Sequence, residues 1–238
     1  DGIHFDYIRY EQTDAGYPSN TSYTKSGLAR FKQTTGYTGT PPATGNTSWN
    51  DFRRREINEL VRRARAEIAS ITTNPRQPVR LSAALVTWGT APSDFHSSSA
   101  YGLFSDWEDW LDKGYLDTGI AMNYFAQSNN SMYTSWVNKQ VIWRHNRQFV
   151  SGPGIYLNPF SNSKYQIEYA LNAGLDGVST YMYTDTTSDS TTWYTWYTTY
   201  APTNVFTTPA PPTPTMPWRS PATATEGTIW GRVTDATT

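Results

Sequence analysis

The sequence predicts an α/β protein built on a parallel sheet, and three observations support this prediction. Short, mostly apolar segments recur along the chain, and each is bounded by Gly, Pro, Asn or Asp. Segments whose apolar residues have helical spacing lie between them. The length of 238 residues suits a single domain of roughly 200 to 250 residues as well as two smaller ones.

Five segments have the character of strands. They are residues 1–10, 79–89, 118–126, 150–160 and 175–185. The first is the alternating sequence DGIHFDYIRY, and the others are mainly apolar. Because apolar runs of this kind are typical of strands covered on both faces, we expect a parallel sheet beneath helices.

The clearest helix is expected between the first two strands. Its apolar face consists of Ile57, Leu60, Val61, Ala64, Ile68 and Ile71, and Arg and Glu occupy the opposite face. Ser48 or Asn50 is available as its N-cap. Shorter helices are expected at residues 107–113, 132–147, 164–173 and 191–200. Each strand is therefore followed by a helix.

Repeated strand–helix units indicate either a doubly wound sheet or a (β/α)8 barrel. A doubly wound nucleotide-binding domain normally has a Gly-rich phosphate loop, and neither GxGxxG nor GxxxxGK[ST] occurs in this sequence. A complete barrel needs eight units in about 250 residues. We therefore expect residues 1–201 to be the C-terminal portion of a (β/α)8 TIM barrel, with about five β/α units.

The composition excludes several classes of function. There are 19 basic and 20 acidic side chains, so the net charge of −1 gives little attraction for nucleic acid. The absence of Cys excludes disulfides and Cys-ligated metals, and no apolar run approaches the roughly 20 residues of a membrane span. Aromatic residues make up 15% of the chain beside abundant Thr, Ser and Asn, which suits neutral sugars or an ordinary extracellular surface equally well.

Candidate catalytic residues lie where the expected strands end, because barrel active sites form at the C-terminal ends of strands. Asp6 is the leading candidate, and His4 or Arg9 is the expected partner that compensates its burial. The alternative is an Asp6–Arg9 ion pair that only holds a loop. Asp185 ranks first as a second carboxylate, followed by Asp94 and then Asp106, which with Asp109 opens a helix and complements its dipole.

Candidate substrate-binding residues surround these acids. They are His4, Arg9, Tyr10, Trp88, Asn123, Tyr124, Tyr181 and Tyr183. Trp88, Trp193, Trp196, Tyr181 and Tyr183 either stack against sugars or fill core and loop contacts. The three histidines are too scattered for a metal triad, and a turn is a better interpretation of Asp185 and Asp189 than a calcium site. No cofactor or metal is predicted.

The opening DGIHFDYIRY resembles the DGIHFDYIRYP signature of the glycoside hydrolase-like 10 family. Residues 106–117, followed by Ala121-Met122-Asn123-Tyr124, are similar to a second motif of that family. Residues 52–54 and 174–178 resemble its helix start and last strand, so the resemblance covers about residues 1–200. Glu11, Ser105 and Ala121 depart from the family pattern without removing a candidate acid.

The resemblance implies a (β/α)8 barrel whose first units precede Asp1, with O-glycosyl hydrolase activity on a carbohydrate polymer. It supports His4, Asp6, Arg9, Asn123 and Tyr124 as site positions. The pair of carboxylates that glycoside hydrolysis needs is then Asp6 with a second acid, which is either one of the candidates above or, equally, an acid in the units that precede Asp1. The alternatives are a non-catalytic carbohydrate-binding barrel and a scaffold domain, and the scaffold predicts no pocket near Asp6.

The remaining segments predict a modular protein. Residues 11–48 are rich in Gly, Thr, Ser and Tyr and are expected to form a substrate-shaping loop. Residues 202–226 are a Pro/Thr-rich linker, and residues 227–238 resemble the first strand of carboxypeptidase regulatory-like β-sandwich modules. This organisation predicts a secreted or cell-surface protein, bacterial in origin, with a downstream β-sandwich module.

Overall fold

The structure is a computed structural model that describes most of the chain between residues 2 and 227. The described residues are 2–10, 25–40, 42–43, 45–71, 79–189, 191–200, 214–220, 222–225 and 227. Residues 228–238, which hold nearly all of the predicted β-sandwich strand, lie outside the described residues.

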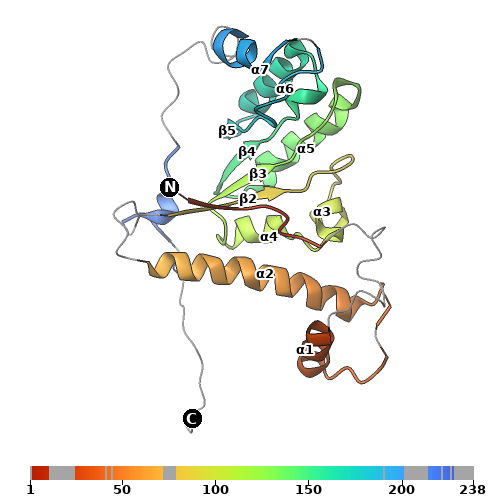
Figure 1. The fold of residues 1–238 in the computed structure, drawn as a ribbon. Coiled ribbons are helices and arrows are strands. Elements are labelled where there is room, and N and C mark those ends of the chain that lie inside the picture. The colour runs from red at the N-terminus through yellow and green to blue at the C-terminus, as the bar shows by residue number, and fades with distance from the viewer. Residues whose placement is uncertain are drawn as a thin grey trace.

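A five-stranded sheet forms the centre of the molecule (Figure 1). The strands are β1 (Gly2–Phe5), β2 (Arg80–Leu85), β3 (Thr118–Ala121), β4 (Gln148–Ser151) and β5 (Gly177–Val178). Each strand pairs in parallel with the next, so the order in space is the order along the chain. The predicted parallel α/β architecture is thus confirmed, and the described sheet has no reversal of strand order of the doubly wound kind.

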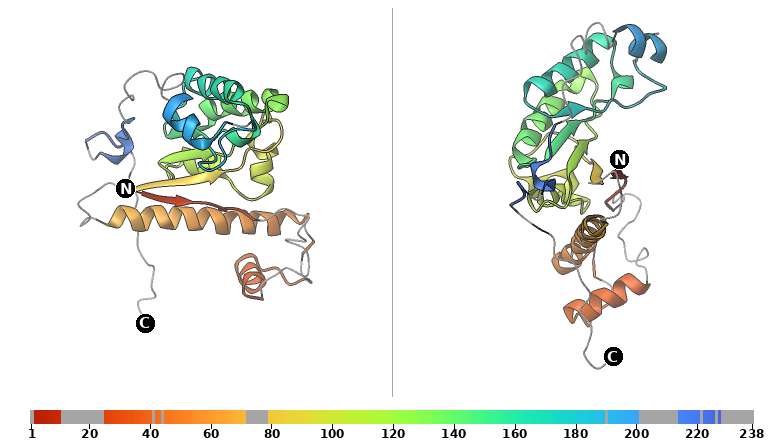
Figure 2. Two further views of the ribbon diagram at one scale, coloured as in Figure 1. Left: turned by 45° about the horizontal axis from the view of Figure 1, so that its top comes forward. Right: turned by 90° about the vertical axis from the view of Figure 1, so that its left-hand side faces the viewer.

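Helices follow the strands, and several of them cover one face of the sheet, whereas the first helix packs on the second (Figure 1). They are α1 (Lys25–Thr35), α2 (Thr47–Ser70), α3 (Ser99–Gly102), α4 (Trp107–Asp112), α5 (Asn130–Trp143), α6 (Phe160–Asn172) and α7 (Trp193–Thr195), which continues into a π-helical turn at Trp196–Tyr200. Short 3-10 turns are Phe95–Ser97, Gln127–Asn129, Ile155–Leu157 and Pro217–Arg219. The long α2 runs beside β1, and α5 and α6 lie together on one face of the sheet (Figure 2).

The alternation of side chains along β2 separates the two faces of the sheet. Leu81, Ala83 and Leu85 are completely buried against the helices, whereas Ser82 and Ala84 are half-buried on the opposite face. Trp107, Trp110 and Trp136 fill the layer between sheet and helices, and each is fully buried. Burying a large apolar side chain stabilises a fold by about 1.5–3 kcal/mol, so this layer supplies much of the core's stability.

Two sequence predictions about the region before β2 are wrong. The N-cap of α2 is Asn46, whose side chain accepts a hydrogen bond from the amide of Trp49, instead of Ser48 or Asn50. The expected loop at residues 11–48 contains α1, which packs Phe31 between Trp49 and Phe52 of α2. Residues 11–24 of that predicted loop lie outside the described residues.

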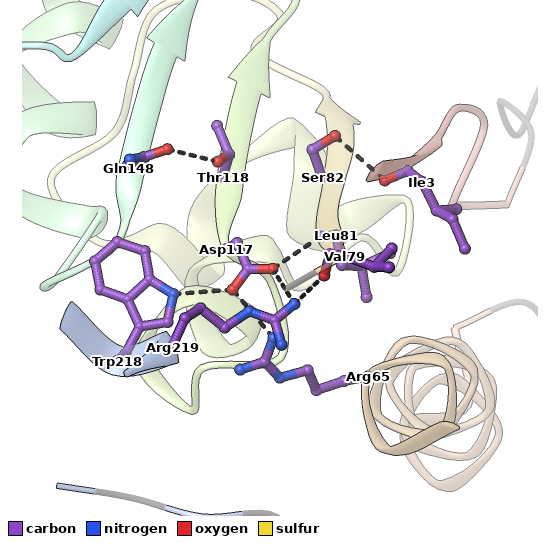
Figure 3. Close-up of polar contacts among 10 residues, drawn as sticks. All are labelled: Ile3, Arg65, Val79, Leu81, Ser82, Asp117, Thr118, Gln148, Trp218 and Arg219. Carbon is purple, nitrogen blue, oxygen red and sulfur yellow. Dashed lines mark hydrogen bonds and ion pairs between the residues drawn. The ribbon is translucent and has the colours of Figure 1, made fainter. Parts of the chain in front are cut away.

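The amino-terminal end of the sheet is held by one buried carboxylate, that of Asp117 (Figure 3). It accepts hydrogen bonds from Arg65 Nη1 at 3.0 Å, the amide of Leu81 at 2.8 Å, Trp218 Nε1 at 2.9 Å and Arg219 Nη2 at 2.8 Å. We call these five residues the Asp117 cluster. It joins α2, β2 and β3 to residues 217–219, which fall within the predicted linker.

No helix in the described part of the chain is long and apolar enough to cross a membrane.

Candidate functional site

A cavity of 370 Å³ opens at the carboxyl ends of the strands, on the face that the helices leave uncovered. We call it the Asp6 cavity. Its wall consists of His4, Asp6, Ser82, Ala84, Ile120, Ala121, Met122, Tyr124, Gly152, Ser179, Thr180 and Tyr181. These residues come from all five strands or from the segments that directly follow them. The strand-end rule for parallel α/β folds therefore locates this site.

Asp6 enters the cavity directly after β1. Its side chain is exposed, and its Oδ1 accepts a hydrogen bond from the amide of Tyr7 at 2.7 Å. Tyr7 has a positive φ of 54°, an uncommon conformation for a residue with a side chain, which turns the chain immediately after Asp6. Within the described residues the carboxylate accepts no other hydrogen bond. Most of its acceptor capacity is therefore open to a ligand.

His4 lies two residues before Asp6 on the same face of β1. Its Nδ1 is 2.9 Å from Ser82 Oγ, and that hydroxyl donates its proton to the carbonyl of Ile3 at 3.4 Å (Figure 3). The Ser82 hydroxyl thereby joins the His4 ring to the backbone of β1 and fixes the ring's orientation. Nε2 makes no hydrogen bond among the described contacts, so it is open to a ligand.

Tyr124 and Tyr181 belong to the cavity wall, and Tyr156, outside the wall, packs against both of them. The rings of Tyr124 and Tyr181 are stacked, with centroids 4.8 Å apart and planes 23° from parallel. Tyr156 meets both edge-on, at 6.5 and 6.0 Å. Burial raises the pKa of Tyr124 to about 12, with smaller contributions from Tyr181, Asp6 and Tyr156. Its hydroxyl thus remains protonated at neutral pH and is a hydrogen-bond donor.

The expected Asp6–Arg9 ion pair is absent among the described contacts. The Arg9 guanidinium instead lies 4.1 Å from the ring centroid of Tyr7 and 5.6 Å from that of Trp88. The alternative role of Asp6 as one half of an ion pair that holds a loop is therefore wrong. Tyr10 packs edge-on against Phe104 at 5.4 Å, and its amide bonds to Leu103.

The structure does not bring the candidate second carboxylates into the wall of the Asp6 cavity. Asp94 caps the 3-10 turn Phe95–Ser97 and lies beside the ring of His96 at 3.3 Å. Asp185 is exposed in the segment after β5. Asp106 is buried at the start of α4, where desolvation and then the charge of Asp109 raise its pKa. Asp6 is thus the one carboxylate among the described residues of this wall.

Two further predicted binding residues have other surroundings. Asn123 is completely buried, and its amide bonds to Gln140 and Ser151 in the core. These core hydrogen bonds hold in place the segment that carries the next residue, Tyr124. Tyr183 is 58% exposed and stacks on Tyr197 at 5.3 Å, outside the cavity wall.

The burial of Trp196 decides between the two roles predicted for it, sugar stacking and core packing. Trp196 is 1% exposed and packs against Ile155, Ile167 and Phe160, so it belongs to the core. The side chain of Trp193 lies outside the described part of the chain.

Ser82 and Tyr156 were missed by sequence reasoning. Ser82 lies within β2, on the face of the sheet that the helices leave uncovered. It pairs with His4 of β1, and the alternation of side chains along β2 is the signal that could have identified it. Tyr156 belongs to a 3-10 turn after β4, and no periodicity marks it.

Comparisons with known proteins leave the family unassigned: no protein-family model matches the chain, and no curated protein matches it significantly. In the described residues, no group of three or more His, Asp or Glu side chains is placed to hold a metal ion.

Proposed function

We propose that the protein is a glycoside hydrolase that cleaves O-glycosidic bonds of a polysaccharide, with Asp6 as catalytic acid or nucleophile. The observation that carries the proposal is the Asp6 cavity, whose wall contains a carboxylate that accepts one hydrogen bond and the stacked rings of Tyr124 and Tyr181. The proposal includes a secreted or cell-surface setting and a downstream β-sandwich module.

We also propose that the sheet is the later portion of a (β/α)8 barrel. The sequential parallel order of five strands supports this, because barrel strands follow one another in the same way. The distribution of side chains supports it too. Ser82 and Ala84 on β2, and Ile120 on β3, remain only half-buried on the uncovered face, which corresponds to a barrel interior.

The chemistry of the cavity suits a sugar ring. Aromatic rings pack against the apolar faces of sugars, and the hydroxyl of Tyr124 and Nε2 of His4 are available to ring hydroxyls. Asp6 would act at the anomeric carbon or at the leaving oxygen. His4 and Tyr124 would orient the sugar.

A second carboxylate completes the reaction, and Asp185 is the first candidate, followed by Asp94. A retaining enzyme needs its two carboxyl groups about 5–5.5 Å apart, and an inverting one about 6.5–9.5 Å apart. The exposed segment that carries Asp185 follows Tyr181 and Tyr183.

The second candidate function is a non-catalytic carbohydrate-binding barrel. The specific observation in its favour is that Asp6 is the sole carboxylate of the described cavity wall. The scaffold alternative predicted no pocket near Asp6, and the cavity of 370 Å³ argues against it.

The test is reducing-sugar release by the full-length chain and by Asp6→Asn, across a panel of bacterial and plant polysaccharides. We expect release by the wild type and a loss of about 10²–10⁴-fold in the variant, as for removal of an acid–base group. Glycan binding without release by the wild type would select the binding barrel instead. Equal release by both proteins would reject the role of Asp6.

A further inference from the structure

A second hollow lies on the outer layer of helices, between α5 and α6. This α5–α6 groove has a volume of 490 Å³ and is lined by Asn138, Tyr165, Glu168, Tyr169, Asn172 and Ala173. The two helices cover the face of the sheet opposite to the Asp6 cavity (Figure 2). The groove is therefore separate from the candidate active site.

Two tyrosines present their rings along this groove. Tyr165 is 45% exposed, and its ring centroid lies 6.2 Å from that of Tyr169, with the planes 37° apart. The hydroxyl of Tyr169 donates a hydrogen bond to Asn138 Oδ1 at 3.0 Å, which joins α6 to α5 and fixes the ring. A rigid aromatic surface of this kind loses little conformational freedom when a ligand binds.

Apart from Glu168, the polar lining of the groove is neutral. Glu168 is the one charged side chain in the described lining, and Lys164 pairs with it one turn away on α6. Asn138 and Asn172 are exposed, and their amides offer donors and acceptors together. A ligand with an apolar face and hydroxyl groups at its edges matches this surface, which is the description of a neutral sugar ring.

A protein partner fits the lining less well. The lining contains no aliphatic side chain larger than Ala173. The exposed aliphatic residues of these helices, Ile142 at 65% and Leu171 at 38%, lie outside it. An obligate interface between proteins, which is more hydrophobic than the rest of the surface, would be expected to include these aliphatic side chains.

We propose that the α5–α6 groove is a second carbohydrate-binding site, which holds a neutral polysaccharide on the outer surface while the Asp6 cavity acts on another part of the chain. The inference rests on the proposed function for its ligand class. It adds a site that retains the polymer near the enzyme and does not take part in bond cleavage.

Native electrophoresis in gels that contain hydroxyethylcellulose, laminarin or soluble starch tests the site. All variants are made in the Asp6→Asn background, so that the polymer stays intact. We expect retention in at least one gel and a dissociation constant about threefold to tenfold higher for Tyr165→Ala, from the loss of ring contact. Tyr165→Trp should retain binding, because it keeps an aromatic face.

Ile142→Ser is the matched control, since it alters an exposed apolar residue of α5 outside the groove. It should leave retention unchanged. Migration that is the same with and without all three glucans would overturn the inference, and so would equal retention of Tyr165→Ala and its parent. Concentration-dependent dimerisation that Tyr165→Ala abolishes would also overturn it, in favour of a contact between copies.

Hydrolysis of short oligosaccharides separates this inference from the proposed function. With Asp6 intact, Tyr165→Ala should cleave them at the wild-type rate. If retention depends on Tyr165 and no hydrolysis occurs, the proposed glycosidase activity is rejected, but the carbohydrate site in the α5–α6 groove is supported. Hydrolysis with retention indifferent to Tyr165 would reject only the groove.

Discussion

The two ends of the sheet each carry an acid, and the surroundings of these acids are opposite. At the amino end, Asp117 is completely buried and accepts four hydrogen bonds, two of them from guanidinium groups. At the carboxyl end, Asp6 is exposed and accepts one bond, from the amide of its neighbour Tyr7. An acid whose acceptor sites are filled stabilises a fold, whereas one whose sites are open is available for binding and chemistry.

The difference extends to the charges around each acid. Asp117 lies among Arg65, Arg219 and Arg147, whose guanidinium is 4.9 Å from the ring of Trp218. Burial lowers the pKa of Arg65, and the neighbouring cations lower it further, while Asp117 opposes the shift. Removing the one carboxylate should therefore leave buried positive charge without compensation.

Asp117→Asn should give the largest loss of stability. We expect the free energy of unfolding to fall by about 3–5 kcal/mol, the usual cost of breaking a buried ion pair by removing one partner. Urea unfolding followed by tryptophan fluorescence measures it. A loss below about 1 kcal/mol would mean that the Asp117 cluster does not hold the amino end together.

Arg219→Gln should have a smaller effect. It removes one charged donor to Asp117 and the bond to the carbonyl of Val79, while Arg65, Leu81 and Trp218 still satisfy the carboxylate. We expect a loss of about 1–3 kcal/mol in urea unfolding, as for a bond to a charged group. A loss equal to that of Asp117→Asn would show that docking of residues 217–219 controls the whole cluster.

Asp106 is a third acid, which is buried but forms no ion pair among the described contacts. Desolvation and the charge of Asp109 raise its pKa above the ordinary 3.8, and the hydrogen bond from Asn58 and the charges of Arg54 and His96 oppose this shift. The folded state thus binds the Asp106 proton more tightly than the unfolded state. Its effect on stability is absent below pH 3.8 and becomes unfavourable as pH rises through the folded-state pKa.

Asp106→Asn should therefore raise the melting temperature at pH 7, and the gain should shrink as pH falls toward 3.8. Thermal unfolding at several pH values measures the trend. A variant that is less stable than the wild type at pH 7 would show that the ionised carboxylate is well accommodated in the folded protein.

Asp6→Asn should have the smallest effect on stability. The side chain is exposed, and Asn retains an oxygen that accepts from the amide of Tyr7. We expect the free energy of unfolding to change by no more than about 0.5 kcal/mol. A loss of more than about 2 kcal/mol would place Asp6 with Asp117, as a structural acid.

The strand–helix alternation was predictable because it depends on periodicity over many residues. The five strands are shorter than expected, since the apolar runs continue past the paired residues into buried loops. Val86, Phe125 and Ile155 are buried core residues of this kind beyond strand ends. Helix α1 was missed because Leu28, Ala29 and Phe31 are its only apolar residues, and only its packing on α2 reveals an apolar face.

The site was predicted in part for a related reason. His4, Asp6, Tyr124 and Tyr181 were identified by their places at strand ends, and the structure brings them together. Asn123 follows the same rule, yet its side chain points into the core, because a strand-end position does not specify the face. The positions of Asp94 and Asp185 depend on the paths of loops, and neither hydrophobic periodicity nor composition determines those paths.

The most direct test of the account is reducing-sugar release by the wild type and Asp6→Asn at equal concentrations of folded protein. We expect release by the wild type, a loss of about 10²–10⁴-fold in the variant, and free energies of unfolding that agree within about 0.5 kcal/mol. Undiminished release by a stably folded Asp6→Asn would contradict it.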